Sequence, residues 1–142
     1  MKIRKATKKD FNKMIKILIE ESSKPPYNEK YTKKIALKEI INLAKNELYV
    51  ALEDGKIIGF IASSITPDNK EKAYINELWL KPSSQGKGIG KSLVKFIEEF
   101  YKKKKVKIIR LLAKKNSKAF GFYKKINYKE YKELVFMEKK IN

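Results

Sequence analysis

The sequence predicts a single α/β domain, built from strands and helices that alternate along 142 residues. Apolar residues recur every two positions in some segments and every three to four in others, which are the periods of strands and helices. A glycine-rich stretch at residues 85–92 joins one such strand directly to one such helix. No internal repeat or shift in composition marks a boundary, so residues 1–142 are expected to form one domain.

Four helices are expected from apolar side chains spaced three and four residues apart. Thr7 is placed to cap the first helix, and Pro25-Pro26 makes residues 22–30 a loop before the second. The apolar stripe of the first helix comprises Phe11, Met14, Ile15, Leu18 and Ile19. The predicted helix bounds are 8–21, 32–45, 89–104 and 117–125.

Six strands are expected from short apolar runs that turn residues interrupt. Asp54-Gly55 is a favoured two-residue hairpin turn and predicts that its two flanking strands pair. Residues 67–72 are expected to form a polar turn. The overall order is β-α-α-β-β-β-α-β-α-β, with strand bounds of 2–6, 48–53, 57–66, 73–80, 107–113 and 134–140.

The stretch QGKGIGKS at residues 85–92 has the composition of an anion-binding loop. Backbone N–H groups at the start of a helix carry partial positive charge, which favours a phosphate. A Walker A loop would need glycine where Gln85 stands, and a dinucleotide fingerprint would need glycine where Lys91 stands. The pattern Q/R-x-x-G-x-G/A fits at Gln85, Gly88 and Gly90.

A second motif, NSKAFGFYKKINY, lies downstream at residues 116–128. Together the two segments resemble the GNAT superfamily of N-acetyltransferases. The first is similar to its acetyl-CoA pyrophosphate loop and the second to its N-x-x-A-x-x-F/L-Y-x-x-x-G-F segment. Asn127 replaces the usual glycine, and asparagine tolerates a left-handed backbone better than other residues. The matching residues are Asn116, Ala119, Phe122, Tyr123 and Tyr128.

The resemblance implies a mixed, mostly antiparallel sheet flanked by helices, splayed between the strand ending at Leu80 and the strand from Lys107. It implies acetyl-CoA as co-substrate, with its pantetheine arm pairing with the splayed strand, and it implies no metal. The cofactor-binding residues that it implies are Leu78, Trp79, Leu80, Gln85, Gly86, Lys87, Gly88, Ile89, Gly90, Lys91, Asn116 and Tyr123.

The resemblance also implies direct transfer of the acetyl group to a primary amine. Tyr123 would protonate the departing thiolate, and Glu77 would act as the base through water. Some relatives carry the carboxylate one residue earlier, where this chain has Asn76. Because strand side chains alternate between faces, only one of these two positions is expected to face the acceptor. The chain has no histidine and no cysteine, which removes the commonest base and any thiol nucleophile.

The expected acceptor is a small-molecule amine, such as a polyamine or an aminoglycoside-like compound. A protein lysine or N-terminal amine is the alternative. In this family the loop between the first two helices usually shapes the acceptor pocket, and this chain carries there Glu20, Glu21, Tyr27, Glu29 and Tyr31. A non-enzymatic module that senses acetyl-CoA or binds RNA is a further alternative. Tyr123 favours catalysis over it, because a pure binder needs no acid near the sulfur. A homodimer is compatible with the fold, but no residue specifies one.

The formal net charge of +19 comes mainly from lysine, since Arg4 and Arg110 are the only arginines. Arginine is the usual reader of guanine, so no sequence-specific nucleic-acid partner is expected. The lysines are interpreted as a solvated surface that also attracts a polyanionic cofactor. No apolar run has the length of a membrane span and no secretory h-region is seen, so we expect no membrane partner and a cytoplasmic location.

Overall fold

The computed structural model describes all 142 residues. They form two compact units, Met1–Leu112 and Ala113–Asn142, and each is described by itself. The prediction of one domain over the whole chain therefore stays a prediction. None of the helices combines the length and the apolar character that crossing a membrane requires.

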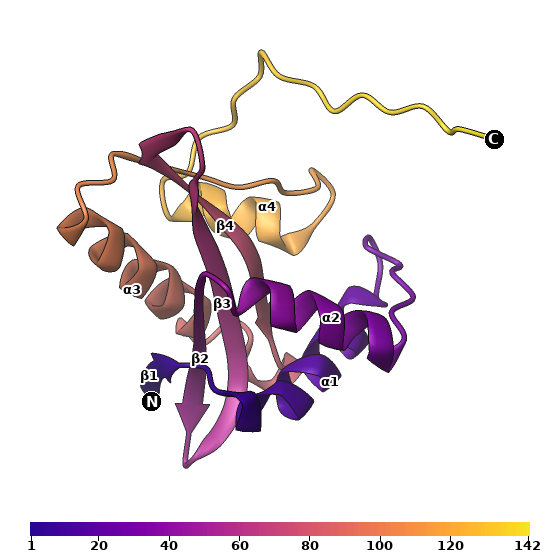
Figure 1. Ribbon diagram of the computed structural model, residues 1–142, viewed down its shortest axis with the longest axis vertical. Coiled ribbons are helices and arrows are strands. Elements are labelled where there is room, and N and C mark those ends of the chain that lie inside the picture. The colour runs from indigo at the N-terminus through magenta and orange to yellow at the C-terminus, as the bar shows by residue number, and fades with distance from the viewer. The chain divides into compact units, whose positions relative to one another are not determined.

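The first unit is built on a five-stranded sheet with the strand order β1-β2-β3-β4-β5 (Figure 1). Neighbouring strands run antiparallel, except that β4 and β5 are parallel. The sheet is therefore mixed and mostly antiparallel, as predicted. The strands are β1 (Lys2–Lys5), β2 (Glu47–Glu53), β3 (Lys56–Thr66), β4 (Asn69–Leu80) and β5 (Ile108–Arg110).

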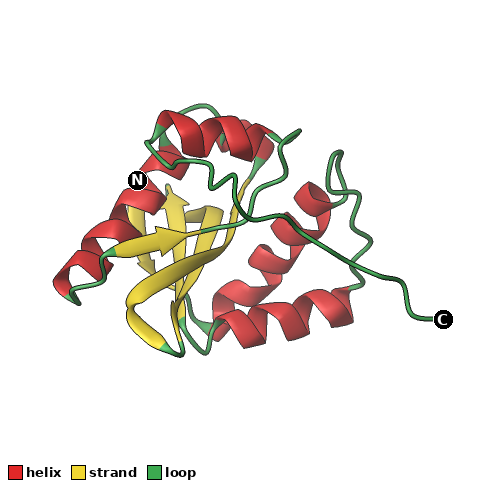
Figure 2. Ribbon diagram, turned by 90° about the horizontal axis from the view of Figure 1, so that it is seen from above, coloured by secondary structure: helices red, strands yellow, loops and turns green.

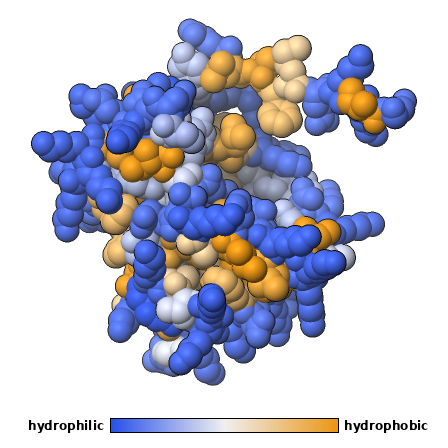
Figure 3. Space-filling model, viewed as in Figure 1, coloured by the Kyte–Doolittle hydropathy of each residue, from blue (hydrophilic) through white to orange (hydrophobic).

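Helices cover both faces of this sheet. Helices α1 (Phe11–Ser22) and α2 (Lys33–Leu43) lie on one face and α3 (Ile89–Lys103) lies on the other (Figure 2). The central strand β3 is accordingly buried from Ile57 to Ser63 without alternation, because both of its faces are covered. The core between α1, α2 and the sheet includes Met14, Leu18, Ile40, Val50 and Phe60. The face shown in Figure 3 is mostly hydrophilic, in keeping with the lysine-rich composition.

The predicted splay lies between β4 and β5. Strand β5 pairs only with Lys72, Ala73 and Tyr74 of β4. From Ile75 to Leu80, β4 pairs with β3 on one side and has no partner strand on the other. An open backbone edge therefore leads, through a short 3₁₀ turn at Pro82–Ser84, to the glycine-rich loop.

One local prediction about the first unit is confirmed and three need correction. The hairpin turn has positive φ at Asp54 and Gly55, 51° and 74°. Thr7 is the N-cap of a short 3₁₀ turn, Lys8–Asp10, and not of the helix predicted at 8–21, since α1 begins at Phe11 with Asp10 as its N-cap. Strand β4 begins at Asn69, inside the predicted 67–72 turn, because Pro67 and Asp68 are enough to reverse the chain. Strand β5 spans only Ile108–Arg110 instead of 107–113, since its pairing with β4 ends there.

The second unit contains α4 (Lys118–Lys125). The Ser117 hydroxyl caps it by accepting a hydrogen bond from the Phe120 N–H at 3.2 Å. Asn127 has a φ of 74°, which confirms the left-handed conformation expected of it. The predicted strand at 134–140 is wrong: the segment has no ladder partner, and the side chains of residues 134–137 are 71–86% exposed. Apolar residues favour a strand, but a strand forms only where a neighbour supplies hydrogen bonds.

Candidate active site

The glycine-rich loop turns the chain from β4 into α3. Gly86 and Gly88 have φ values of +73° and +82°, and Gly88 is the N-cap of α3. A Cβ at either position would meet nothing within 4 Å, so glycine serves the backbone conformation there and not a close approach. The first N–H groups of a helix lack intrahelical acceptors, and no acidic residue occupies the first turn of α3. The loop therefore has the features that favour an anion at the start of α3.

Gln85 begins this loop, but its side chain is already engaged. Its amide nitrogen Nε2 donates to Glu21 Oε1 at 2.8 Å and to the carbonyl of Leu80 at 3.1 Å. Glu21 was predicted at the acceptor pocket, yet it is buried between this amide and the ammonium of Lys24. The two N–H groups of the Gln85 amide are therefore used within the protein and not offered to a ligand.

The open edge of β4 faces away from β3. The Lys81 N–H donates to the carbonyl of Ile58 at 2.9 Å. Hydrogen-bonded pairs alternate along an antiparallel ladder, so the backbone groups of Leu78 and Leu80 are expected to point away from β3. The bond from Gln85 to the Leu80 carbonyl agrees with this direction.

Glu77 and Trp79 lie on one face of β4. The indole N–H of Trp79 donates to Glu77 Oε2 at 2.6 Å, and Tyr27 packs edge-on against the indole with ring centroids 5.3 Å apart. Burial raises the pKa of Glu77 to about 7; the Trp79 hydrogen bond lowers it, and the charges of Glu39 and Glu29 raise it further. Glu77 is therefore poised to exchange a proton near neutral pH.

A cavity of about 320 Å³ opens beside Glu77. Asn76 and Glu77 both line it, so the alternation of side chains expected for these two neighbours does not hold here. Ala62 pairs with Glu77 and Ser63 with Ile75, so Asn76 is the extra residue of a β-bulge. A bulge breaks the alternation of side chains. The polar residues that line the cavity are Glu39, Asn42, Asn46, Ser64, Asn76 and Glu77.

The sequence analysis missed Glu39. It lies in the middle of α2, and Asn42 and Asn46 follow it three and seven residues later. The spacing of Glu39 and Asn42 places two polar side chains on one side of the predicted helix, and Asn46 follows just after the helix ends. Neither Glu39 nor Glu77 forms an ion pair with a lysine or arginine. Two acidic groups therefore face one cavity in a strongly basic chain.

Other residues of the α1–α2 loop lie close to the carboxylates of Glu77 and Glu39. Burial raises the pKa of Tyr31, and the charges of Glu77, Glu39 and Glu29 raise it further. Tyr27 contacts Trp79 as described, whereas Glu20 is exposed at the end of α1. Tyr27, Glu29 and Tyr31 are thus associated with Glu77, while Glu21 is directed to the glycine-rich loop.

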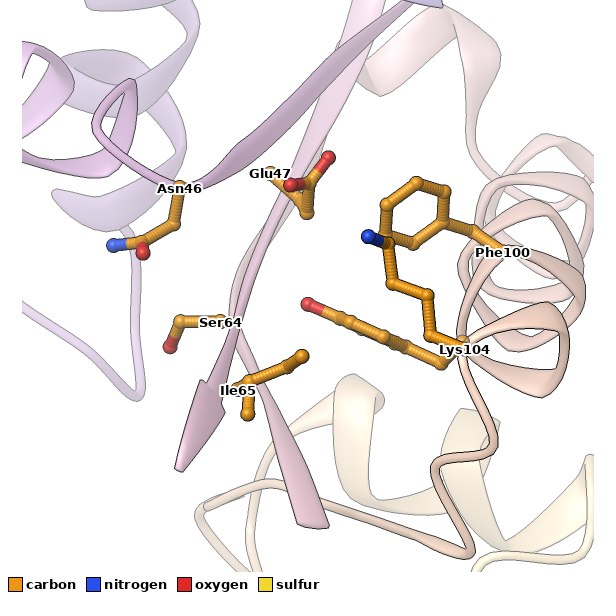
Figure 4. Close-up of a pocket in the computed structure, with 7 residues that line it drawn as sticks. Asn46, Glu47, Ser64, Ile65, Phe100 and Lys104 are labelled. Atoms are coloured by element: carbon orange, nitrogen blue, oxygen red, sulfur yellow. The ribbon is translucent and has the colours of Figure 1, made fainter. Parts of the chain in front are cut away.

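A second cavity, of about 120 Å³, lies at the C-terminal end of α3 (Figure 4). Phe100 of α3, the residue Lys104 that caps this helix, and Glu47 and Ser64 of the sheet line it. The glycine-rich loop is at the opposite end of α3. The cavity is too small for a coenzyme and distant from the loop, so we assign it no part in the chemistry.

The second unit holds the other two predicted site residues. Tyr123 in α4 is buried and packs edge-on against Phe122 and Tyr128, with ring centroids 5.0 and 5.4 Å apart. Asn116 is exposed immediately before the Ser117 cap. No group of three or more histidine, cysteine, aspartate or glutamate side chains is arranged to hold a metal ion.

The model of the Acetyltransferase (GNAT) family matches residues 11–128. The chain belongs to this family, and the match spans both units. The glycine-rich loop, the splayed β4 edge and the 116–128 segment all fall within it.

Individual relatives agree with the family. The chain is 28% identical over 141 residues to an uncharacterized N-acetyltransferase of Methanocaldococcus jannaschii, covering 94% of this chain. It is 38% identical over 105 residues to a spermidine N(1)-acetyltransferase of Thermoplasma acidophilum, covering 71% of this chain. The chain spans only 62% and 63% of the length of these two curated relatives.

A solved structure shows the same fold. The PaiA N-acetyltransferase of Thermoplasma acidophilum, in complex with coenzyme A, superposes with a TM-score of 0.72 at 32% identity. The superposition covers 90% of this chain and 89% of that one.

Proposed function

We propose that this chain is an N-acetyltransferase that transfers the acetyl group of acetyl-CoA directly to a primary amine of a small cationic molecule. One observation carries the proposal: an open glycine-rich loop follows, after a short 3₁₀ turn, on a strand edge that the sheet leaves unpaired. These are the two surfaces that a diphosphate and a pantetheine arm need. The relatives named as a spermidine acetyltransferase and as a coenzyme A complex support it.

The cofactor would lie along the end of β4 and the start of α3. The backbone N–H groups of residues 86–91 would bind the diphosphate, and the exposed Lys87 and Lys91 add positive charge beside it. The arm would pair with the backbone of residues 78–80. A backbone N–H there would polarise the thioester carbonyl, and its hydrogen bond would strengthen as the oxyanion develops. Asn116 would contact the arm further along.

Glu77 would act as the general base. An amine of the lysine type has a pKa of about 10.4 and must lose a proton before it attacks. A base works best when its pKa lies near the working pH, and burial holds the pKa of Glu77 at about 7. The amine nitrogen forms the new C–N bond, and its proton passes to Glu77 through water.

Tyr123 would act as the general acid. As the C–S bond breaks, its hydroxyl gives a proton to the departing sulfur. A thiol has a pKa of about 8.5, so the thiolate is already a fair leaving group. The contribution expected of Tyr123 is therefore moderate.

The cavity beside Glu77 would receive the acceptor. Its two carboxylates suit a cation, and its amide and hydroxyl groups can accept hydrogen bonds from an ammonium. A volume of about 320 Å³ is at the lower end of the range for ligand pockets. It favours a linear polyamine over a compound with several rings.

The proposal is tested by measuring CoA release with a thiol-reactive dye. The chain has no cysteine, so every thiol detected comes from CoA. The acceptor panel comprises spermidine, a diaminoalkane, an aminoglycoside, a lysine peptide and a peptide with a free N-terminus. We expect saturable release with the linear polyamines.

Other outcomes separate the alternatives. Release with the peptides alone would replace the small-molecule acceptor with a protein amine. Thermal stabilisation by acetyl-CoA without release on any amine would indicate a binding module. No stabilisation at saturating acetyl-CoA would refute the proposed cofactor site.

A further inference from the structure

Glu21 occupies an unusual place for a carboxylate. It lies in the last turn of α1, is only 7% exposed, and both of its oxygens have partners. Oε1 accepts the hydrogen bond from Gln85, 64 residues further along the chain, and Oε2 pairs with Lys24. It therefore connects the end of α1 to the first residue of the phosphate loop.

Backbone hydrogen bonds hold the ends of that loop, from the Gln85 N–H to the Pro82 carbonyl and from the Ser92 N–H to the Gly88 carbonyl, whereas few side chains pack against its middle. Gln85, Gly86, Lys87 and Gly88 are all exposed, and the space around a Cβ at either glycine is empty. The loop is fixed at its far end by the buried Ile89. At its near end it is fixed by the Gln85 amide, which bonds to Glu21 and to Leu80 at once.

The charge of Glu21 is the wrong sign for a residue near a phosphate site. Like charges repel, more strongly where water is excluded. Lys24 neutralises the carboxylate locally, as its contact with Oε2 shows. A carboxylate in this place can instead fix the position of Gln85, because it accepts a strong hydrogen bond from the Gln85 amide.

We propose that Glu21 is a positioning residue that holds the phosphate loop in its anion-binding shape through Gln85. The inference rests on the proposed binding of acetyl-CoA at this loop. Glu21 itself does not touch the cofactor. Its contribution is to keep the backbone N–H groups of the loop pointing at the diphosphate.

If Glu21 acted only through its charge, its loss would strengthen CoA binding, whereas loss of its hydrogen bond to Gln85 should weaken it. These opposite effects on CoA affinity make the inference testable. Glu21→Ala removes both the charge and the hydrogen bond, and we expect CoA to bind about tenfold more weakly. Glu21→Gln removes the charge but keeps an oxygen that accepts from Gln85, so CoA should bind as tightly as to wild type or more tightly. Gln85→Ala should weaken binding about as much as Glu21→Ala. The double variant should be no weaker than either single one, because both substitutions break the same bond.

The experiment is calorimetric titration of the full chain with CoA and with S-acetylpantetheine, which lacks the diphosphate. Glu99→Ala, at an exposed position on α3, is the matched control for the loss of a helical glutamate. The inference expects Glu21→Ala to weaken CoA binding and to leave binding of the fragment unchanged. It also expects a raised KM for acetyl-CoA with an unchanged KM for the amine.

Equal weakening for CoA and the fragment would overturn the inference, since Glu21 would then only support the fold. Tighter CoA binding by Glu21→Ala would overturn it in favour of simple charge repulsion. Failure of wild type to bind CoA would instead refute the proposed function. The two failures are thus distinguishable.

Discussion

The indole N–H of Trp79 donates a hydrogen bond of 2.6 Å to the carboxylate of Glu77, two residues earlier on β4. Side chains two apart on a strand share a face, so the two side chains lie together, and Glu77 lines the cavity proposed for the acceptor. The hydrogen bond favours the charged form of Glu77 and lowers its pKa, while burial raises it more strongly. The proton affinity of the proposed base thus depends on two opposed effects.

Glu77→Gln is expected to remove the base. In wild type, kcat/KM should rise with pH through about 7, because the ionised form of Glu77 is the active one. The variant should lose this limb and about 10²- to 10⁴-fold of the rate at its plateau. The measurement is kcat/KM from pH 5 to 9, with Glu99→Gln as the control. An unchanged profile would remove Glu77 from the mechanism.

The same substitution should change stability with pH. The folded pKa of Glu77, about 7, exceeds its ordinary value of 4.5. Between these values the folded chain binds more protons than the unfolded chain, so this group makes stability fall as pH rises. Glu77→Gln abolishes the fall, and the Tm of the variant relative to wild type should be higher at pH 8 than at pH 4.5. A Tm difference that does not vary with pH would contradict the raised pKa.

Trp79→Phe should shift the pH dependence of kcat/KM to higher pH. The substitution keeps an aromatic ring against Tyr27 but removes the hydrogen bond that lowers the pKa of Glu77. The limb of kcat/KM should therefore shift to higher pH, whereas Glu77→Gln eliminates it. A shift to lower pH would show that the indole does not stabilise the carboxylate.

Glu39→Gln tests the acceptor cavity. A diamine can place one ammonium at Glu77 and the other at Glu39, since both carboxylates line the same cavity. Loss of a hydrogen bond to a charged group should raise the KM of a diamine about tenfold. The KM of a monoamine of equal chain length should stay the same, as should both values in Glu99→Gln. Equal effects on the KM of the diamine and of the monoamine would show that Glu39 does not bind the second ammonium group.

Tyr123→Phe tests the proposed acid. Phenylalanine preserves the ring contacts with Phe122 and Tyr128 and removes only the hydroxyl. We expect kcat to fall by about 10²-fold or more without vanishing, because the thiolate leaves readily. Single-turnover measurement of CoA release would give the rate of the chemical step. A full kcat in this variant would leave Tyr123 a packing role alone.

Gly59→Ala probes the contact between β3 and the open end of β4. A Cβ at Gly59 would lie 2.3 Å from Leu80 Cδ2 and 2.7 Å from the Trp79 carbonyl. Overpacking of this kind costs about 1–3 kcal/mol, and it should push the β4 edge away and raise the KM for acetyl-CoA. Gly121→Ala in α4 meets nothing within 4 Å and should keep or raise the Tm. An unaltered Tm for Gly59→Ala would show that β4 can move away from the added Cβ without a cost in stability.

The sequence by itself determined the features that depend on near neighbours along the chain. The left-handed conformations at Gly86, Gly88 and Asn127 follow from residue type, as does the Asp54-Gly55 turn. The two motifs were sufficient for the family, which the match over residues 11–128 confirms. Such features survive in a linear pattern because their physical causes act within a few residues.

Only the tertiary structure decided how distant segments meet. The bulge at Asn76 depends on the register between β3 and β4, and it puts two neighbouring side chains on one cavity. Glu21 meets Gln85 across 64 residues, and Glu39 comes to Glu77 because α2 packs near the end of β4. The predicted strand at 134–140 did not form because propensity cannot supply a ladder partner. Register, packing and pairing are long-range properties, so no local pattern encodes them.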